Sequence, residues 1–212
     1  MKKKTLTIAI ALVLVVALAV GATYAYLTAQ TKTVKNTFVA GGAVDQNDLN
    51  LYEHKAKLND DGTYTLGSEV LDGSEGKTGN EYTVMPGVNL PKDPTVEVTA
   101  ANGPYYLFVK VTEGAHFNKD IFGYSIDDAA WKQLKDADGK DVAGVYVYTT
   151  DKTNAAILTG AVTANVLKDK VVTVADADSI TLADADCTLT FQAYACQAAG
   201  LTPYAAYQAA AK

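Results

Sequence analysis

Tyr105-Tyr-Leu-Phe-Val-Lys-Val-Thr112 is apolar at nearly every position, and this stretch decides the fold class. A strand with one face in water alternates apolar and polar residues, whereas a strand covered on both faces is a near-continuous run of aromatic and aliphatic residues. The turn residues Asn102-Gly-Pro104 come directly before the run. The stretch therefore predicts a central strand in a covered sheet.

Shorter strand-like stretches lie on both sides of this run and are separated by turn residues such as Asn59-Asp-Asp-Gly62. We expect strands at residues 33–39, 49–58, 63–66, 95–99, 144–149, 170–174 and 188–194, and a polar loop at 67–80. Helical periodicity is scarce. Residues 127–135 could form one or two turns, and residues 202–211 predict a helix with Thr202 as N-cap and Pro203 at its first position. The pattern predicts an all-β fold, with residues 41–212 as a single jelly-roll-like β-sandwich with minor helices.

The N-terminus has the composition of a secretory signal. Lys2, Lys3 and Lys4 precede an apolar run at residues 6–20, and small residues follow in Gly21-Ala-Thr-Tyr-Ala25. We expect a helical signal peptide at residues 1–25, cleaved after Ala25 with Thr23 at the −3 position and Tyr26 as the new N-terminus. A membrane span needs about 20 apolar residues, so a retained anchor is the alternative only if Gly21 and Ala22 extend the run. The protein is expected to be secreted.

The charge pattern excludes one class of partner. The chain carries a net charge of −6, its 18 basic residues are all lysine, and no acidic residue precedes Asp45. Removal of residues 1–25 would make the remainder still more acidic. A chain of this charge, with no arginine to grip phosphates, is not expected to bind nucleic acid.

A search for catalytic motifs finds none. His54 and His116 are far apart in the chain, and neither belongs to a His-Glu-x-x-His pair. Cys187 and Cys196 lie in one strand-like run, roughly 30 Å apart if extended, which is too far for a disulfide. We expect no enzyme activity, no cofactor and no metal site.

Two groups of acidic residues admit a second interpretation. Asp136-Ala-Asp-Gly-Lys-Asp141 resembles the start of a calcium loop, but its glycine is misplaced and Val147 stands at the twelfth position, so we expect a hairpin turn. The aspartates of residues 176–178 and 184–186 are expected to be loop carboxylates, with a weak calcium site as the alternative. The tyrosines of the strands could likewise form a sugar-binding surface, although packing within the sheet is the simpler role.

Several stretches resemble the TasA/camelysin family of exported biofilm-matrix proteins. The matching stretches are Gly21-Ala-Thr-Tyr-Ala25, Asn36-Thr-Phe-Val-Ala-Gly41, Met85-Pro-Gly87, Leu90-Pro-Lys-Asp-Pro-Thr-Val96, Tyr106-Leu-Phe-Val-Lys-Val111 and Phe191-Gln-Ala-Tyr-Ala-Cys-Gln197. The resemblance implies a jelly roll, cleavage by an ER-type signal peptidase of the SipW kind, and assembly into fibres in the extracellular matrix or at the surface of a Gram-positive cell. It also implies self-association by donor-strand exchange and, as a further partner, a minor anchoring or assembly protein.

Residues 26–40 suit a donor strand. The segment contains no proline or glycine, so it can form an uninterrupted ladder, and Lys32, Val34, Asn36, Phe38 and Ala40 share one face. A lone strand cannot satisfy its own backbone polar groups, and the open edge of a neighbouring subunit can do so. Pairing within its own domain is the alternative.

The sequence thus predicts a non-catalytic fibre subunit. A monomeric binding module or adhesin is the alternative, and a camelysin-like metallopeptidase is disfavoured because no zinc-ligand motif is present.

Overall fold

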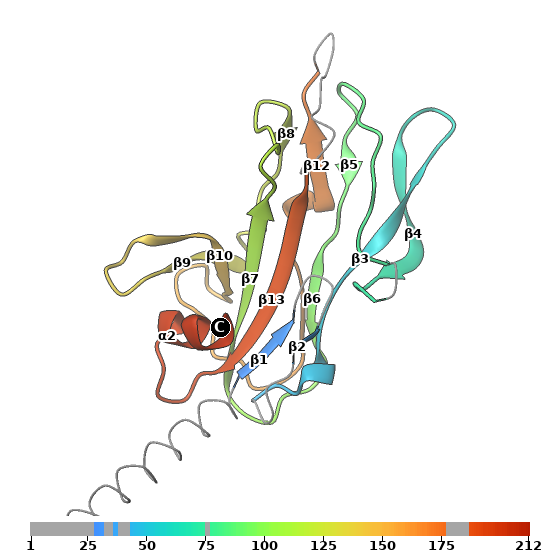
Figure 1. Cartoon of the computed structure of the whole chain (residues 1–212). Helices are drawn as coiled ribbons and strands as arrows, with labels where there is room; N and C mark the ends of the chain where they lie inside the picture. The colour runs from blue at the N-terminus through green and yellow to red at the C-terminus, as the bar shows by residue number, and fades with distance from the viewer. Residues whose placement is uncertain (1–27, 32–35, 38–42, 75–76, 177–186) are drawn as a thin grey trace, which may run out of the picture.

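Figure 1 shows the computed structural model, which describes residues 28–31, 36–37, 43–74, 77–176 and 187–212. The described strands form three antiparallel sheets. The six-stranded sheet has the order β2 (Asn36–Thr37), β1 (Thr28–Thr31), β13 (Leu189–Gln197), β7 (Tyr105–Glu113), β10 (Asp141–Tyr148) and β9 (Trp131–Lys135). The four-stranded sheet has the order β11 (Val162–Asn165), β6 (Thr95–Val98), β3 (Leu49–Leu58) and β4 (Tyr64–Leu71). The three-stranded sheet has the order β5 (Leu90–Pro91), β12 (Val171–Val174) and β8 (Phe122–Gly123). The described helical elements are η1 (Gln46–Asp48), η2 (Lys168–Lys170) and α2 (Pro203–Ala210).

Strand β7 lies inside the six-stranded sheet, as its sequence predicts. It pairs with β13 through nine consecutive residue pairs and with β10 on its other side. All residues from Tyr105 to Val109 are buried. Continuous burial shows that other layers cover both faces of the strand.

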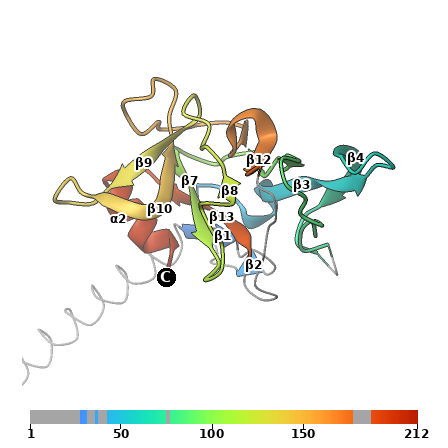
Figure 2. The same ribbon diagram turned by 90° about the horizontal axis from the view of Figure 1, so that it is seen from above.

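Those covering layers differ in kind. Leu107 and Val109 pack with Val96 and Val98 of the four-stranded sheet in one apolar cluster. On the opposite face, α2 covers the sheet, and the rings of Phe108 and Tyr207 lie 5.6 Å apart. Figures 1 and 2 show α2 on one side of β7 and β13 and the β3–β4 hairpin on the other. The all-β class is confirmed, and so is the capped C-terminal helix, in which the Thr202 side chain accepts a hydrogen bond from the Ala205 amide.

The helical turns expected at residues 127–135 are wrong in part, because Trp131–Lys135 forms strand β9. The spacing of Trp131 and Leu134, three residues apart, is typical of one helical face. In this strand the two side chains point to opposite faces, Trp131 into the core between the sheets and Leu134 into the core under α2. Burial on both faces produced the misleading spacing.

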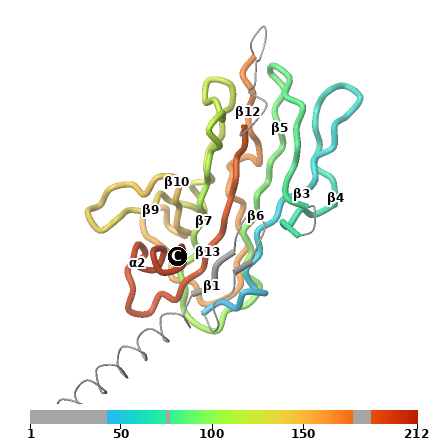
Figure 3. Tube along the Cα trace, viewed as in Figure 1, coloured from blue at the N-terminus to red at the C-terminus, as the bar shows by residue number. Residues whose placement is uncertain are grey.

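The loop expected at residues 67–80 is also shorter than predicted, since β4 extends to Leu71. Val70 and Leu71 pair with His54 and Glu53 of β3. The stretch is polar because most of β4 faces solvent in the hairpin that Figure 3 traces away from the six-stranded sheet. The turn at the tip of that hairpin, residues 59–62, is confirmed by hydrogen bonds between Asn59 and Thr63 and between Gly62 and Asn59.

Two short strands are described within the N-terminal segment. Strands β1 and β2 pair antiparallel with each other. Strand β1 also pairs with β13 of the same chain, with Thr28 opposite Cys196 and Gln30 opposite Tyr194. In this single chain the segment therefore lies on its own sheet.

Gly144 marks a close approach between β10 and β7. Its φ is +68°, in the left-handed region, and a Cβ at this position would overlap the carbonyl oxygen of Val111. Gly139 has a similar φ of +79°, but a Cβ added there would meet nothing within 4 Å. The two glycines therefore share one backbone conformation and differ in the space around them.

This difference gives a matched pair of variants. We expect Gly144→Ala to lower the free energy of unfolding by about 3 kcal/mol or more, because the left-handed strain and the clash with β7 act together. Gly139→Ala should cost about 1 kcal/mol, the left-handed penalty alone. Denaturant titration measures both losses, and equal losses would contradict the close approach.

Candidate functional site

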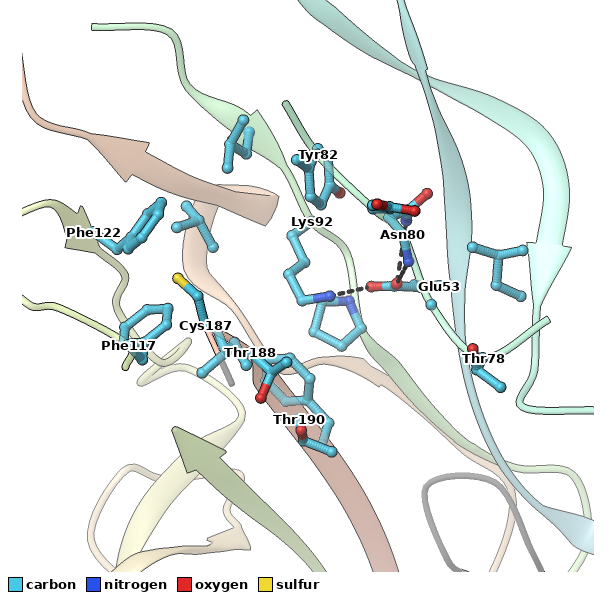
Figure 4. A pocket seen from close by; sticks show the side chains of 18 of the residues that line it. Glu53, Thr78, Asn80, Tyr82, Lys92, Phe117, Phe122, Cys187, Thr188 and Thr190 are labelled. Carbon is cyan, nitrogen blue, oxygen red and sulfur yellow. Dashed lines mark hydrogen bonds and ion pairs between the residues drawn. The ribbon is translucent and has the colours of Figure 1, made fainter. Parts of the chain in front are cut away.

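A cleft of about 770 Å³ lies where the three sheets meet. One wall comes from β3 and residues 78–84, and the other from β8, β12 and the start of β13 (Figure 4). Its volume falls within the range of small-molecule sites, which is about 300 to 1,000 Å³. A second depression, of about 460 Å³, lies between β9 and the start of α2.

A largely buried ion pair lies in this cleft. The Lys92 ammonium is 2.8 Å from Oε2 of Glu53, and only 12% and 9% of the two side chains are exposed. The backbone and side-chain nitrogens of Asn80 donate to Oε1 of the same carboxylate at 3.0 and 3.1 Å. Both oxygens of Glu53 thus have partners, as burial of a charge requires.

Asn80 also forms hydrogen bonds with the backbone of β3 where the pairing of that strand is irregular. The register of β3 with β4 shifts between His54 and Ala56. The Asn80 side chain accepts a hydrogen bond from the Ala56 amide at 2.7 Å and donates one to the His54 carbonyl at 2.9 Å. Its amide is therefore fixed both by the strand and by Glu53.

A second buried carboxylate, that of Asp93, contacts the next residue of β3. Asp93 is 4% exposed at its side chain, accepts a hydrogen bond from the His54 backbone amide at 2.9 Å, and lies 2.7 Å from Nδ1 of the His54 ring. Residues 53 and 54 of β3 are thus tied to residues 92 and 93, on opposite faces of the strand. This pairing fixes β3 to the segment between β5 and β6.

Aromatic rings line the rest of the cleft. Phe117 and Phe122 stack with centroids 5.2 Å apart, and the Lys92 ammonium lies 5.5 Å from the centre of the Phe191 ring. Tyr82 donates a hydrogen bond to the Pro91 carbonyl. Burial, followed by the nearby carboxylates of Glu53 and Asp93, raises the pKa of Tyr82 well above its ordinary value. The phenol stays neutral and serves as a donor.

The thiol at the cleft is not activated. Cys187 is half-buried, and burial raises its pKa, which disfavours the nucleophilic thiolate. Neither cysteine forms a disulfide, as expected, and Cys187 lies beside the core between the sheets while Cys196 lies in the core under α2.

The expected functional residues of the N-terminus fall mainly outside the described residues. These are the cleavage residues Thr23, Ala25 and Tyr26 and the strand residues Lys32, Val34, Phe38 and Ala40. Asn36 is described and begins β2. Their predicted roles remain predictions.

The other expected sites give a mixed outcome. Asp136 closes the β9–β10 hairpin, where its carboxylate accepts hydrogen bonds from the Asp138 and Lys140 amides, so the turn interpretation is confirmed. The aspartates of residues 178–186 lie outside the described residues.

Among the residues the structure describes, no cluster of three or more histidine, cysteine or acidic side chains could hold a metal ion. No helix in the same residues has the length and hydropathy of a membrane span.

One sequence signal for the cleft was overlooked. Leu49, Leu51 and Glu53 alternate on one face of β3, so a carboxylate stands where the pattern requires an apolar residue. A charge on a core-facing position needs a partner, but alternation alone does not name Lys92 or Asn80.

Comparisons with known proteins give no further identification. No family model, no curated protein and no solved structure matches this chain.

The ion pair gives a test of this geometry. Lys92→Leu leaves the Glu53 carboxylate buried without a cation, so we expect the free energy of unfolding to fall by about 3–5 kcal/mol. Lys55→Leu is the control, because it breaks an ion pair with Glu69 whose side chains are 56% and 49% exposed, and should cost less than about 1 kcal/mol. Equal losses in urea titrations would show that Lys92 is not buried against Glu53.

Proposed function

We propose that this protein is an exported structural subunit of extracellular fibres. In this proposal residues 1–25 are a signal peptide, the two facing sheets are a jelly-roll variant, and the mature N-terminal segment joins one subunit to the next. The resemblance to biofilm-matrix proteins suggests this role.

The observation that carries the proposal is the position of β1. This strand adds to β13 at the far side from β7, and its described residues Thr28, Ala29 and Gln30 pair there with Cys196, Ala195 and Tyr194. An identical strand from a neighbour can form the same pairs with β13. Exchange of this strand therefore needs no new contact surface.

Such an exchange would propagate. The donor strand and the acceptor edge are different parts of each subunit, so the contact is head-to-tail and need not close into a ring. The backbone groups of β1 would be satisfied equally well in the monomer and in the fibre. A higher protein concentration then shifts the equilibrium from the monomer toward the fibre, because only the fibre forms by association of several chains.

The cleft favours a second candidate function, a monomeric binding module. An aromatic-lined depression of about 770 Å³ suits a ligand more than it suits a purely structural subunit. Size that is independent of concentration in X-ray scattering would favour this module over the fibre subunit.

Deletion of residues 26–35 from the mature chain tests the fibre proposal. The shortened protein should stay folded, since the β7–β13 core is intact, but should form no filaments in negative-stain micrographs at concentrations where the mature chain does. A synthetic peptide of residues 26–40 should bind the shortened protein one-to-one and raise its melting temperature, whereas a scrambled peptide should not. Filaments from the shortened protein would refute the proposal.

A further inference from the structure

Two side chains of complementary reactivity meet at the buried Glu53. One carboxylate oxygen contacts the Lys92 ammonium at 2.8 Å, and the other accepts a hydrogen bond from the Asn80 side-chain nitrogen at 3.1 Å. Figure 4 shows the carboxylate between the amine and the amide, with both contacts dashed. An amine, an amide and a carboxylate that touches both are the components of an acyl transfer.

The ion pair is largely withdrawn from water, in a cleft that Tyr82 also lines. Only 9% of the Glu53 side chain is exposed. Keeping two charges in such a place costs desolvation free energy that a neutral product would not.

We propose that Lys92 and Asn80 become joined by an isopeptide bond, in a self-catalysed reaction in which Glu53 is the base. Glu53 takes a proton from the Lys92 ammonium, and the neutral amine attacks the Asn80 side-chain carbonyl carbon. The Nζ–Cγ bond forms, the Cγ–Nδ2 bond breaks, and a second proton from Nζ leaves with Nδ2 as ammonia. Glu53 ends as a neutral carboxylic acid beside the new amide, so two buried charges are lost.

The reaction requires one movement. The Asn80 amide must turn from the backbone of β3, where it contacts Ala56 and His54, toward the lysine. Residues 77–89 contain no helix or strand, so this segment can adjust, and the lysine side chain is long and unbranched. Loss of ammonia makes the step effectively irreversible.

The bond would join Asn80, in one wall of the cleft, covalently to Lys92, which directly follows β5. It would close the loop from residue 80 to residue 92, which no disulfide constrains because neither cysteine forms one. A covalent loop closure stabilises by restricting the unfolded chain, as a disulfide does. The proposal concerns a single chain and is independent of fibre assembly.

Cleavage at methionine tests the bond directly. The chain contains two methionines, Met1 and Met85, so cyanogen bromide cuts the mature chain once, between Asn80 and Lys92. Denatured, reduced protein cut under conditions that spare the acid-labile Asp93–Pro94 bond should run as one joined species if the isopeptide is present. Two separate fragments would overturn the proposal.

Mass spectrometry supplies the second readout. The intact protein should be lighter than its sequence by one ammonia, about 17 Da, and trypsin should not cut after Lys92. A succinimide at Asn102-Gly103 would lose the same mass, so fragment spectra must place the loss on residues 80 and 92. A loss placed at residue 102 overturns the proposal.

Three variants complete the test. Lys92→Arg and Glu53→Gln should each restore the full mass and yield two fragments, because the first removes the amine and the second removes the base. The matched exposed variant Lys55→Arg should stay joined. The fragment pattern and the mass are both measured on denatured protein, and each shows whether the bond has formed. A joined species from Lys92→Arg would contradict the assignment of the bond to Lys92.

Discussion

The pairing of β13 with β7 is the constraint on which the rest of the structure depends. Nine consecutive residue pairs join the two strands, and Tyr105 to Val109 are buried without interruption. A strand buried on both faces needs two covering layers, which are the four-stranded sheet on one side and α2 on the other. Once β7 occupies one edge of β13, the other edge is where β1 adds. The fibre proposal rests on the position of β1 at that edge.

Local signals predicted much of this fold, and tertiary burial decided the rest. The apolar run at residues 105–112, the strand at residues 49–58, the turn at residues 59–62 and the capped C-terminal helix were all readable, because each depends on neighbours within a few residues. Strand β9 could not be predicted in this way. Trp131 and Leu134 are buried in different cores, and their three-residue spacing is also the spacing of one helical face. The extension of β4 was missed because its residues gain their order from β3 and not from an apolar face of their own.

The cleft could be anticipated only in part. Glu53 stands on the core-facing side of β3, which signals a buried charge, but its partners are 27 and 39 residues away in the chain. Neither histidine belongs to a motif that would predict a partner; His116 is exposed, yet the ring of His54 contacts the buried Asp93. The carboxylates of Glu53 and Asp93 therefore both help to fix β3 to residues 92 and 93. Long-range pairing of this kind follows from the sheet order, which sequence periodicity does not supply.

The most direct measurement is a disulfide trap between β1 and β13. Thr28 lies opposite the native Cys196, and directly opposed residues of an antiparallel pair are close enough to bridge. Thr28→Cys in a Cys187→Ser background should form the bond within one chain when the protein is dilute. In assembled material the same bond should join different chains and give a ladder on a non-reducing gel. Assembled material that contains only intrachain bonds would contradict strand exchange.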